Sequence, residues 1–409
     1  MDRISSLPDN VIDAILKCLS IRDVVQTSIL SHAWRDQLST VSQLVFDKET
    51  FPCPEDQQQK DYDNKIARII DQVLLLHQGT INRFKLSVDL TSYPDIDRWI
   101  RYLSRHGVAE LILEIWKDSP YRLPSSFFSW KGITNLKLYR CIFHPPSSFN
   151  GFNRLTVLDL QEVTSTDEEL GRLLSLCPSL RKLRLKDVDC TTLRISNQEL
   201  VDLSIEGKQI QLYLESTPHL AVASIVFSSR SDDQMLDDGM VPNIVNLLSN
   251  LPRIERLALL DYTLEALSIG VVPVSLPVLF PLKHLNININ FVDVGELLAA
   301  FCILRSSLVL EKLAIVVANV DGFDGMPSED FWQAQEEFNC NFTHLQTVEM
   351  TEIYGTTAEL KFIEFILANA ALLERMQIQF RKKVRDEAKI MRQLLQLQRS
   401  SVKAKIIVP

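Results

Sequence analysis

Residues 155–186 read LTVLDLQEVTSTDEELGRLLSLCPSLRKLRLK, and this stretch contains the same short pattern twice. If the first leucine of the pattern is position s, leucines also stand at s+3 and s+5. The side chains at s+3 and s+5 fall on one face of a β-strand, because alternate residues of a strand point to the same side. We therefore expect two strands, each followed by a segment that returns the chain to the start of the next. The two copies are Leu155-Leu158-Leu160 and Leu180-Leu183-Leu185.

Apolar residues repeat this pattern along most of the chain, with twelve matches between residues 81 and 378. Successive starts are mostly 20 to 28 residues apart, and two gaps of 34 and 35 residues indicate insertions. A period of about 20 to 29 residues is typical of leucine-rich repeats, whose units bury their leucines only by stacking into a shared core and a parallel sheet. The Asn or Cys expected three residues after the last leucine appears at Cys141 and is missing from most of the other repeats, so we expect irregular repeats. The matches start at Ile81, Val108, Ile133, Leu155, Leu180, Leu200, Leu220, Ile254, Leu282, Leu310, Leu345 and Leu373.

The first 45 residues carry a helical pattern instead. Apolar residues recur there at spacings of three and four, which predicts an amphipathic helix. Asp23 suits the cap of a second helix, and a third short segment carries Trp34. Because a helical unit of about 40 residues has a very small core, we expect it to bury its remaining apolar surface against another protein. The recurring residues are Leu7, Val11, Ile12, Ile15, Leu16 and Leu19.

Charge and composition exclude several classes of protein. Hydrophobic residues make up 46% of the chain and charged residues 23%, as in an ordinary globular protein. With 43 Lys and Arg against 52 Asp and Glu, the net charge of -9 argues against a general affinity for nucleic acids or anionic membranes. The most apolar stretch, residues 267–282, is interrupted by Pro273, Pro277 and Pro281, so we expect no membrane-spanning helix.

The sequence contains no local signature of catalysis. Its seven cysteines stand singly, which fits neither a disulfide framework nor a clustered zinc site. The motifs H-E-x-x-H, G-x-S-x-G, G-x-x-x-x-G-K-[ST] and G-x-G-x-x-G are absent from the printed sequence. We therefore expect no catalytic residue, no metal site and no cofactor, and we interpret the chain as a protein that is not an enzyme.

Two segments resemble known families. The N-terminal LPDNVIDAILKCL, followed by IRDVVQTSILSHAWR, resembles the F-box in its plant form. The stretch LQTVEMTEIYGTTAELKFIEFILANAALLERMQI, residues 345–378, is similar to the FBD segment that closes many plant F-box and leucine-rich-repeat proteins. The resemblance implies that the F-box docks on a Skp-type adaptor, which joins it to a cullin and a RING subunit in a ubiquitin ligase.

The resemblance also assigns the adaptor contacts. The alternative, which the sequence leaves open, is that Ile15 and Leu16 only fill the F-box core. The candidate adaptor-binding residues are Leu7, Pro8, Val11, Ile12, Ile15, Leu16 and Trp34.

These observations define an α/β fold with five parts: a small helical F-box, a linker and connecting helix, an irregular leucine-rich-repeat solenoid with a curved parallel sheet and returning helices, an FBD-like end, and a tail. The tail contains a helix and an end strand. The expected boundaries are 1–45, 46–80, 81–340, 341–385 and 386–409.

If s+3 and s+5 point inward, then s+2, s+4 and s+6 line the opposite face of the sheet, where a substrate can bind. The basic stripe Lys182, Arg184 and Lys186 suits an acidic degron or a phosphate. Cross-strand pairing with Asp159, Asp202 and Glu206 is the favoured alternative. The candidate substrate-binding residues are Lys137, Tyr139, Lys182, Arg184, Lys186, His284, Asn286 and Asn288.

The sequence therefore predicts a substrate-recognition subunit of a Skp-cullin-F-box ubiquitin ligase that holds an unknown protein substrate and neither nucleic acid nor membrane. A non-degradative interaction scaffold is the alternative, and a small-molecule signal receptor is a third. The N-terminus lacks the cationic start and apolar run of a signal peptide, so we expect a cytoplasmic or nuclear location, or both.

Overall fold

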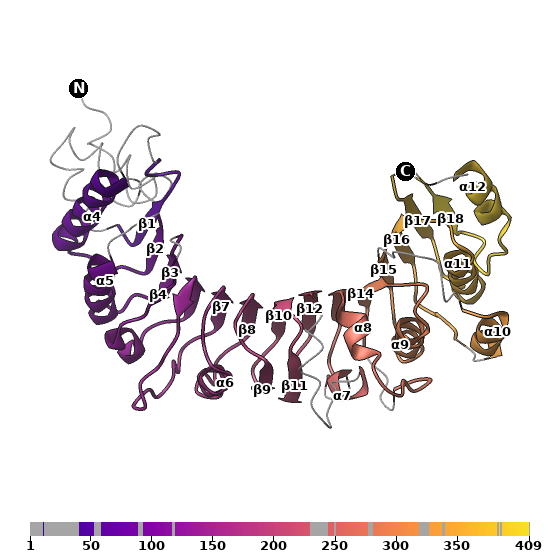
Figure 1. Ribbon diagram of the computed structural model, residues 1–409, viewed down its shortest axis with the longest axis horizontal. Coiled ribbons are helices and arrows are strands. Elements are labelled where there is room, and N and C mark those ends of the chain that lie inside the picture. Colours follow the sequence, from indigo (N-terminus) through magenta and orange to yellow (C-terminus); the bar gives the residue numbers. More distant parts are fainter. Residues whose placement is uncertain are drawn as a thin grey trace. The chain divides into compact units, whose positions relative to one another are not determined.

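In the computed structural model (Figure 1), the chain divides into two compact units, residues 1–190 and residues 191–409, which we call the N-terminal and the C-terminal unit. The structure describes residues 11, 41–52, 59–88, 93–116, 119–229, 244–248, 251–276, 281–318, 327–337, 340–382, 384 and 387–408.

The N-terminal unit is built on a parallel β-sheet whose strand order is β1-β2-β3-β5-β7-β8. Helices α4 and α5 lie side by side on one face of this sheet, and α6 connects β7 to β8 (Figure 1). A small second sheet pairs β4 with β6. The strands are β1 (Gln43–Asp47), β2 (Arg83–Ser87), β3 (Glu110–Glu114), β4 (Tyr121–Arg122), β5 (Asn135–Tyr139), β6 (Cys141–Ile142), β7 (Val157–Gln161) and β8 (Lys182–Lys186). The helices are α4 (Gln59–Leu76), α5 (Tyr93–Arg105), the 3-10 helix η1 (Ser125–Ser129) and α6 (Asp167–Ser175).

The C-terminal unit has a parallel sheet in the order β10-β12-β13-β14-β15-β16-β17-β18 and a second sheet that pairs β9 with β11. Helices α8, α9 and α11 pack on one face of the larger sheet (Figure 1). The strands are β9 (Thr192–Ser196), β10 (Asp202–Lys208), β11 (Gln211–Ser216), β12 (Val222–Ser229), β13 (Arg256–Asp261), β14 (His284–Ile289), β15 (Lys312–Val317), β16 (Thr347–Ile353), β17 (Arg375–Phe380) and β18 (Lys405–Ile407). The helices are α7 (Ile244–Leu248), α8 (Thr263–Leu267), α9 (Val294–Arg305), α10 (Glu329–Glu337), α11 (Thr357–Asn369) and α12 (Glu387–Gln396).

The repeated apolar pattern builds the core of both units. In each of the twelve triplets, s+3 and s+5 fall on a separate strand of a main sheet, s lies just before that strand, and every member is buried. Neighbouring strands pair in register at s+3, for example Leu257 with Leu285, and Leu285 with Leu313. Within each unit, the shared register joins the leucines of neighbouring repeats into a continuous apolar layer, so each repeat relies on its neighbours to bury its leucines. The predicted parallel α/β repeat architecture is confirmed.

Two features depart from the expected organisation. The pattern was expected from Ile81, but β1 carries an earlier copy in which Val41, Leu44 and Phe46 are buried, and β1 pairs with β2. The returning segments were expected to be helices, but two of them are the strands β9 and β11. The repeats that start at Leu180 and Leu200 are each only 20 residues long, which leaves room for an extended return and not for a helix.

Candidate functional site

The expected adaptor-binding residues fall almost entirely outside the described part of the chain. Val11 is the exception: it has helical conformation and its side chain is 38% exposed. An exposed valine on a helix is available to a partner. The other expected contacts, which lie outside the described residues, are Leu7, Pro8, Ile12, Ile15, Leu16 and Trp34.

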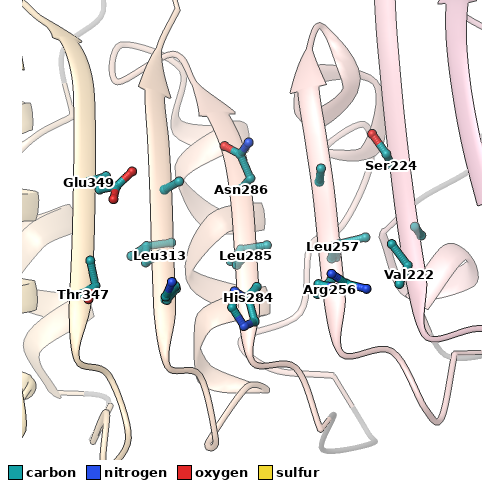
Figure 2. A pocket seen from close by; sticks show the side chains of 14 residues that line it. Val222, Ser224, Arg256, Leu257, His284, Leu285, Asn286, Leu313, Thr347 and Glu349 are labelled. Atoms are coloured by element: carbon teal, nitrogen blue, oxygen red, sulfur yellow. The ribbon is translucent and has the colours of Figure 1, made fainter. Parts of the chain in front are cut away.

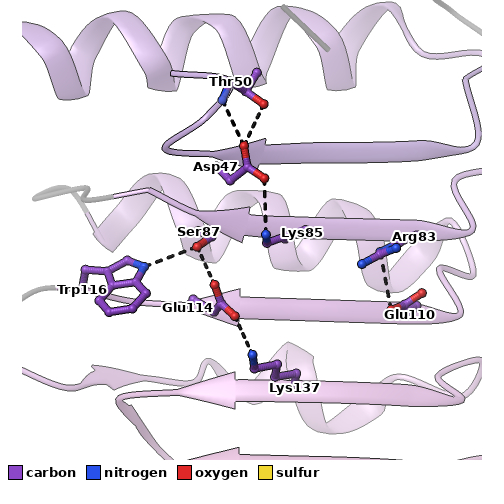
Figure 3. Close-up of polar contacts among 9 residues, drawn as sticks. All are labelled: Asp47, Thr50, Arg83, Lys85, Ser87, Glu110, Glu114, Trp116 and Lys137. Atoms are coloured by element: carbon purple, nitrogen blue, oxygen red, sulfur yellow. Dashed lines mark hydrogen bonds and ion pairs between the residues drawn. The ribbon is translucent and has the colours of Figure 1, made fainter. Parts of the chain in front are cut away.

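On the N-terminal unit, two of the expected substrate-binding residues, Lys137 and Tyr139, lie on β5 in a network of polar contacts (Figure 3). The Lys137 ammonium lies 2.7 Å from a carboxylate oxygen of Glu114 on β3, and the Ser87 hydroxyl on β2 donates to the same carboxylate. Burial alone would raise the pKa of Glu114, but the hydrogen bonds from Lys137 and Ser87 outweigh it and lower the pKa. Lys137 is therefore already paired within the fold.

The same face of the N-terminal unit contains further cross-strand pairs. Lys85 lies 3.3 Å from Asp47, and Arg83 lies 3.5 Å from Glu110 (Figure 3). Oppositely charged residues on adjacent strands contribute roughly 0.2–1 kcal/mol per pair to a sheet. The charges of this face thus stabilise the unit that carries them.

Tyr139 takes part in an aromatic group at the ends of β3 and β5. Its ring centroid lies 4.8 Å from that of Trp116, and its hydroxyl donates to Glu162 at 2.9 Å. The indole nitrogen of Trp116 donates to Ser87 at 3.3 Å, and the Lys48 ammonium lies 4.7 Å from the Trp116 ring centroid. Trp116 lies two residues beyond the end of β3, at a position that the apolar triplet does not include. The ring is 41% exposed, so this group remains accessible although it is internally bonded.

The basic stripe on β8 has unequal members. Lys182 and Lys186 are half-buried and each already makes an interaction with other groups of the chain. Arg184 is exposed and stands opposite Asp159 in the register of β7 and β8, yet the described residues form no ion pair between them. Asp159 instead accepts a hydrogen bond of 2.9 Å from the Gln161 amide. Judged by its contacts with the described residues, the stripe therefore offers Arg184 as a free cation, while Lys182 and Lys186 are engaged.

On the C-terminal unit, one register position carries a Lys or Arg on four of six consecutive strands, and His284 and Thr347 occupy it on the other two. We call this set the cation row. Arg256 on β13 pairs in register with His284 on β14, and His284 pairs with Lys312 on β15. In the part of the chain that the structure describes, the side chains of Arg256, Lys312, Arg375 and Lys405 are exposed and form no ion pair. The full row is Arg256, His284, Lys312, Thr347, Arg375 and Lys405.

Beside the cation row the same face is hollowed into a groove of about 330 Å³ (Figure 2). The cation row stands at s+2, and we call s+4, the next position on the same face, the second register position. The hollow exists because this position holds the small side chains of Ser224, Ala258 and Ala314 on β12, β13 and β15. Two of the expected substrate-binding residues, His284 and Asn286, line this groove. The third, Asn288, lies one step further along β14, opposite Val316, and is not part of the lining.

The floor of the groove contains an unsatisfied polar group. Asn286 lies between Ala258 and Ala314 in the register of β13, β14 and β15. Its side-chain carbonyl oxygen is buried and accepts no hydrogen bond from the described residues. A buried acceptor without a donor costs roughly 1–3 kcal/mol. Glu349 on β16 closes the side of the groove with a carboxylate (Figure 2).

Arg256 and Lys312 were not among the candidate site residues. The signal that finds them is the one that selected His284, because all three stand at s+2 of a repeat. The three cations of β8 stand at alternate positions of one strand, so they can be recognised in the sequence. The members of the cation row stand on different strands, and only the register of the sheet brings them together.

The described cysteines Cys177, Cys302 and Cys340 are buried. Burial raises the pKa of the Cys177, Cys302 and Cys340 thiols to about 11, so they remain protonated and poorly nucleophilic. Within the described ranges, no group of three or more His, Cys, Asp or Glu side chains is placed to hold a metal ion. No described helix combines the length and apolar character needed to cross a bilayer.

Comparison with known proteins places both parts of the chain in one family. The F-box domain matches residues 4–45, and the family described as At1g61320/AtMIF1, LRR domain, matches residues 73–405. The Arabidopsis thaliana F-box/FBD/LRR-repeat protein At1g13570 is 34% identical over 381 residues, which cover 92% of this chain and 91% of that protein.

Further relatives come from the same plant. The F-box/LRR-repeat protein At3g58940 is 26% identical over 410 residues, which cover 92% of this chain and 65% of that protein. The F-box/FBD/LRR-repeat protein At5g56420 is 27% identical over 269 residues, which cover 64% of this chain and 56% of that protein. Together with the parallel sheets of stacked repeats, these matches show that the chain belongs to the plant F-box/leucine-rich-repeat family, in which the F-box gives it a role in protein interaction.

Proposed function

We propose that this chain is the substrate-recognition subunit of a Skp-cullin-F-box ubiquitin ligase. Its F-box binds a Skp-type adaptor, which connects it to a cullin and a RING subunit, and its repeats hold a protein substrate. The chain acts by positioning, because holding a substrate lysine near the ubiquitin thioester carried by another subunit turns a bimolecular reaction into an effectively unimolecular one.

The observation that carries this proposal is the pairing of the cation row with the groove on the C-terminal unit. A fold needs no exposed cations without partners beside an unfilled hollow, and surface charges of this kind contribute little to stability. A partner that supplies acidic groups gains every contact without breaking an existing ion pair. The face therefore has the properties of a binding surface more than those of a structural one.

The proposal separates into two measurable steps. We would co-express the full chain with a plant Skp-type adaptor and compare it with the double substitution Leu7→Ala, Pro8→Ala. The wild-type chain should co-purify with the adaptor, and the substituted chain should lose it. Failure of the wild-type chain to bind any Skp-type adaptor would refute the ligase assignment.

The second step is ubiquitin transfer. The reconstituted ligase should ubiquitinate a substrate held by the repeats, and substitution of Arg256 and Lys312 should reduce transfer while the adaptor stays bound. Adaptor and substrate binding without transfer would favour the interaction scaffold over the ligase subunit.

A further inference from the structure

We propose that the strand face of the C-terminal unit recognises an acidic segment of a partner protein in the polyproline II conformation, with a carboxylate side chain at every third position. This inference rests on the proposed function and specifies the substrate of that site. Its basis is the position of three cations, Arg256, Lys312 and Arg375, which stand at the same register position on β13, β15 and β17.

The spacing of these cations selects the conformation of the ligand. Adjacent strands lie about 4.8 Å apart, so cations on alternate strands are about 9.6 Å apart. A polyproline II helix has three residues per turn and a rise of about 3.1 Å per residue, which places every third side chain on one side at intervals of about 9.3 Å. Same-side residues of a fully extended peptide recur at about 6.7 Å and fall out of step with the row.

The three cations are free to bind. Arg256, Lys312 and Arg375 are exposed, and none of them forms an ion pair or side-chain hydrogen bond with another described residue. His284 and Thr347 occupy the intervening strands. Three carboxylates of the ligand can therefore contact three cations at once without competition from within the fold.

The second register position provides space for the backbone of the ligand. The small side chains of Ser224, Ala258 and Ala314 leave the hollow beside the cations. Asn286 lines this hollow between Ala258 and Ala314 and provides a polar side chain beside the path of the segment. Glu349 stands at this second position and repels a carboxylate there, which restricts the acidic side chains of the ligand to the cation row.

Acidic residues directly before the strands do not cancel the row. Glu255, Glu311 and Glu374 each precede a cation by one residue, and neighbouring residues of an extended chain point to opposite sides. Glu255 lies 3.4 Å from the Lys283 ammonium and is already paired. The row therefore keeps a positive face in a chain whose net charge is -9.

The test is fluorescence anisotropy of labelled peptides with the full chain in its adaptor complex. The probe repeats Glu-Ala-Pro four times. One control peptide has the same composition with its glutamates grouped together, and a second has Gln in place of Glu. The probe should bind at least about tenfold more tightly than the grouped peptide, and raising the salt concentration should weaken it.

Variants of the row sharpen the result. Arg256→Gln, Lys312→Gln and Arg375→Gln should each lower the affinity for the probe about two- to fivefold, as expected for single exposed ion pairs. The three substitutions together should lower it about 10- to 100-fold. Arg154→Gln, which removes an exposed cation of the N-terminal unit outside its strands, should leave binding unchanged.

The proposal is overturned if the grouped peptide binds as well as the probe, if no acidic peptide binds, or if only a phosphopeptide or an oligonucleotide binds. The adaptor is quantified in every sample. Lost peptide binding with the adaptor retained overturns this inference alone, and retained peptide binding with no adaptor overturns the proposed function alone.

Discussion

The strand faces of the two units carry similar residue types and use them differently. On the N-terminal unit, Lys85, Arg83 and Lys137 are paired with carboxylates on neighbouring strands at 2.7–3.5 Å. On the C-terminal unit, Arg256 and Lys312 are exposed and form no ion pair with a described residue. A paired charge stabilises the sheet that carries it, whereas an unpaired charge is available to a partner. We therefore assign partner binding to the face whose cations lack ion pairs, and not to the face with the larger number of cations.

The largest expected effect comes from reversing the charge of the cation row. The double substitution Arg256→Glu, Lys312→Glu removes two attractions and adds two repulsions, which at up to about 1 kcal/mol each weakens binding of an acidic partner by up to about 4 kcal/mol. Unfolding in urea should change by less than about 0.5 kcal/mol, because neither side chain has a partner to lose. A large loss of stability would show that these cations are structural and would remove the contrast between the units.

The next effect concerns a capping box that occurs in both units. Thr166 and Glu169 begin α6, and Thr356 and Glu359 begin α11 with the same reciprocal hydrogen bonds. Glu359 is buried, and desolvation raises its pKa from 4.5 to about 7 despite backbone N–H bonds that favour the ionised form.

Because the folded state holds this proton more tightly than the unfolded state, the free energy of unfolding should fall as pH rises from about 4.5 to about 7, by up to about 3 kcal/mol. Glu359→Gln has no proton to lose, so the difference between wild type and variant in urea titrations should follow this pH range. A difference that does not depend on pH would contradict the raised pKa.

A third prediction tests the paired face directly. Lys137→Met leaves the half-buried Glu114 carboxylate without its cation and should destabilise the chain by about 1–2 kcal/mol in urea unfolding. Affinity for the acidic peptide should stay within twofold of wild type. If peptide binding falls and stability does not, the N-terminal face contributes to recognition and the comparison fails.

The smallest effect comes from filling the groove. Ala258→Leu places a larger side chain in the hollow and removes space for the peptide backbone. The substitution should weaken binding of the acidic peptide by about 1 kcal/mol, which is at the low end of the cost of overpacking. The matched control is Ala371→Leu, an exposed position of the same unit outside the groove. Equal affinities of wild type and Ala258→Leu would place the ligand elsewhere.

The fold follows from the sequence wherever the apolar triplet is repeated, because each triplet must be buried and only stacking buries it. The place of β1 in the sheet could not be predicted in this way, because the polar residues 53–60 separate its copy of the pattern from the other copies. The candidate site is only partly predictable. His284 and Asn286 follow from the alternation of strand residues, but the groove depends on which residues of neighbouring strands share a register. Likewise, the pairing of Lys137 with Glu114 depends on the register of β3 and β5.

The most direct test of the central claim is ubiquitin transfer by the reconstituted ligase to a carrier protein that bears the Glu-Ala-Pro segment. Transfer should occur with the wild-type chain, stop with Arg256→Gln, Lys312→Gln, Arg375→Gln, and continue with Arg184→Gln. Transfer that survives loss of the three cations, or that stops with Arg184→Gln, would contradict the assignment of substrate binding to the C-terminal unit.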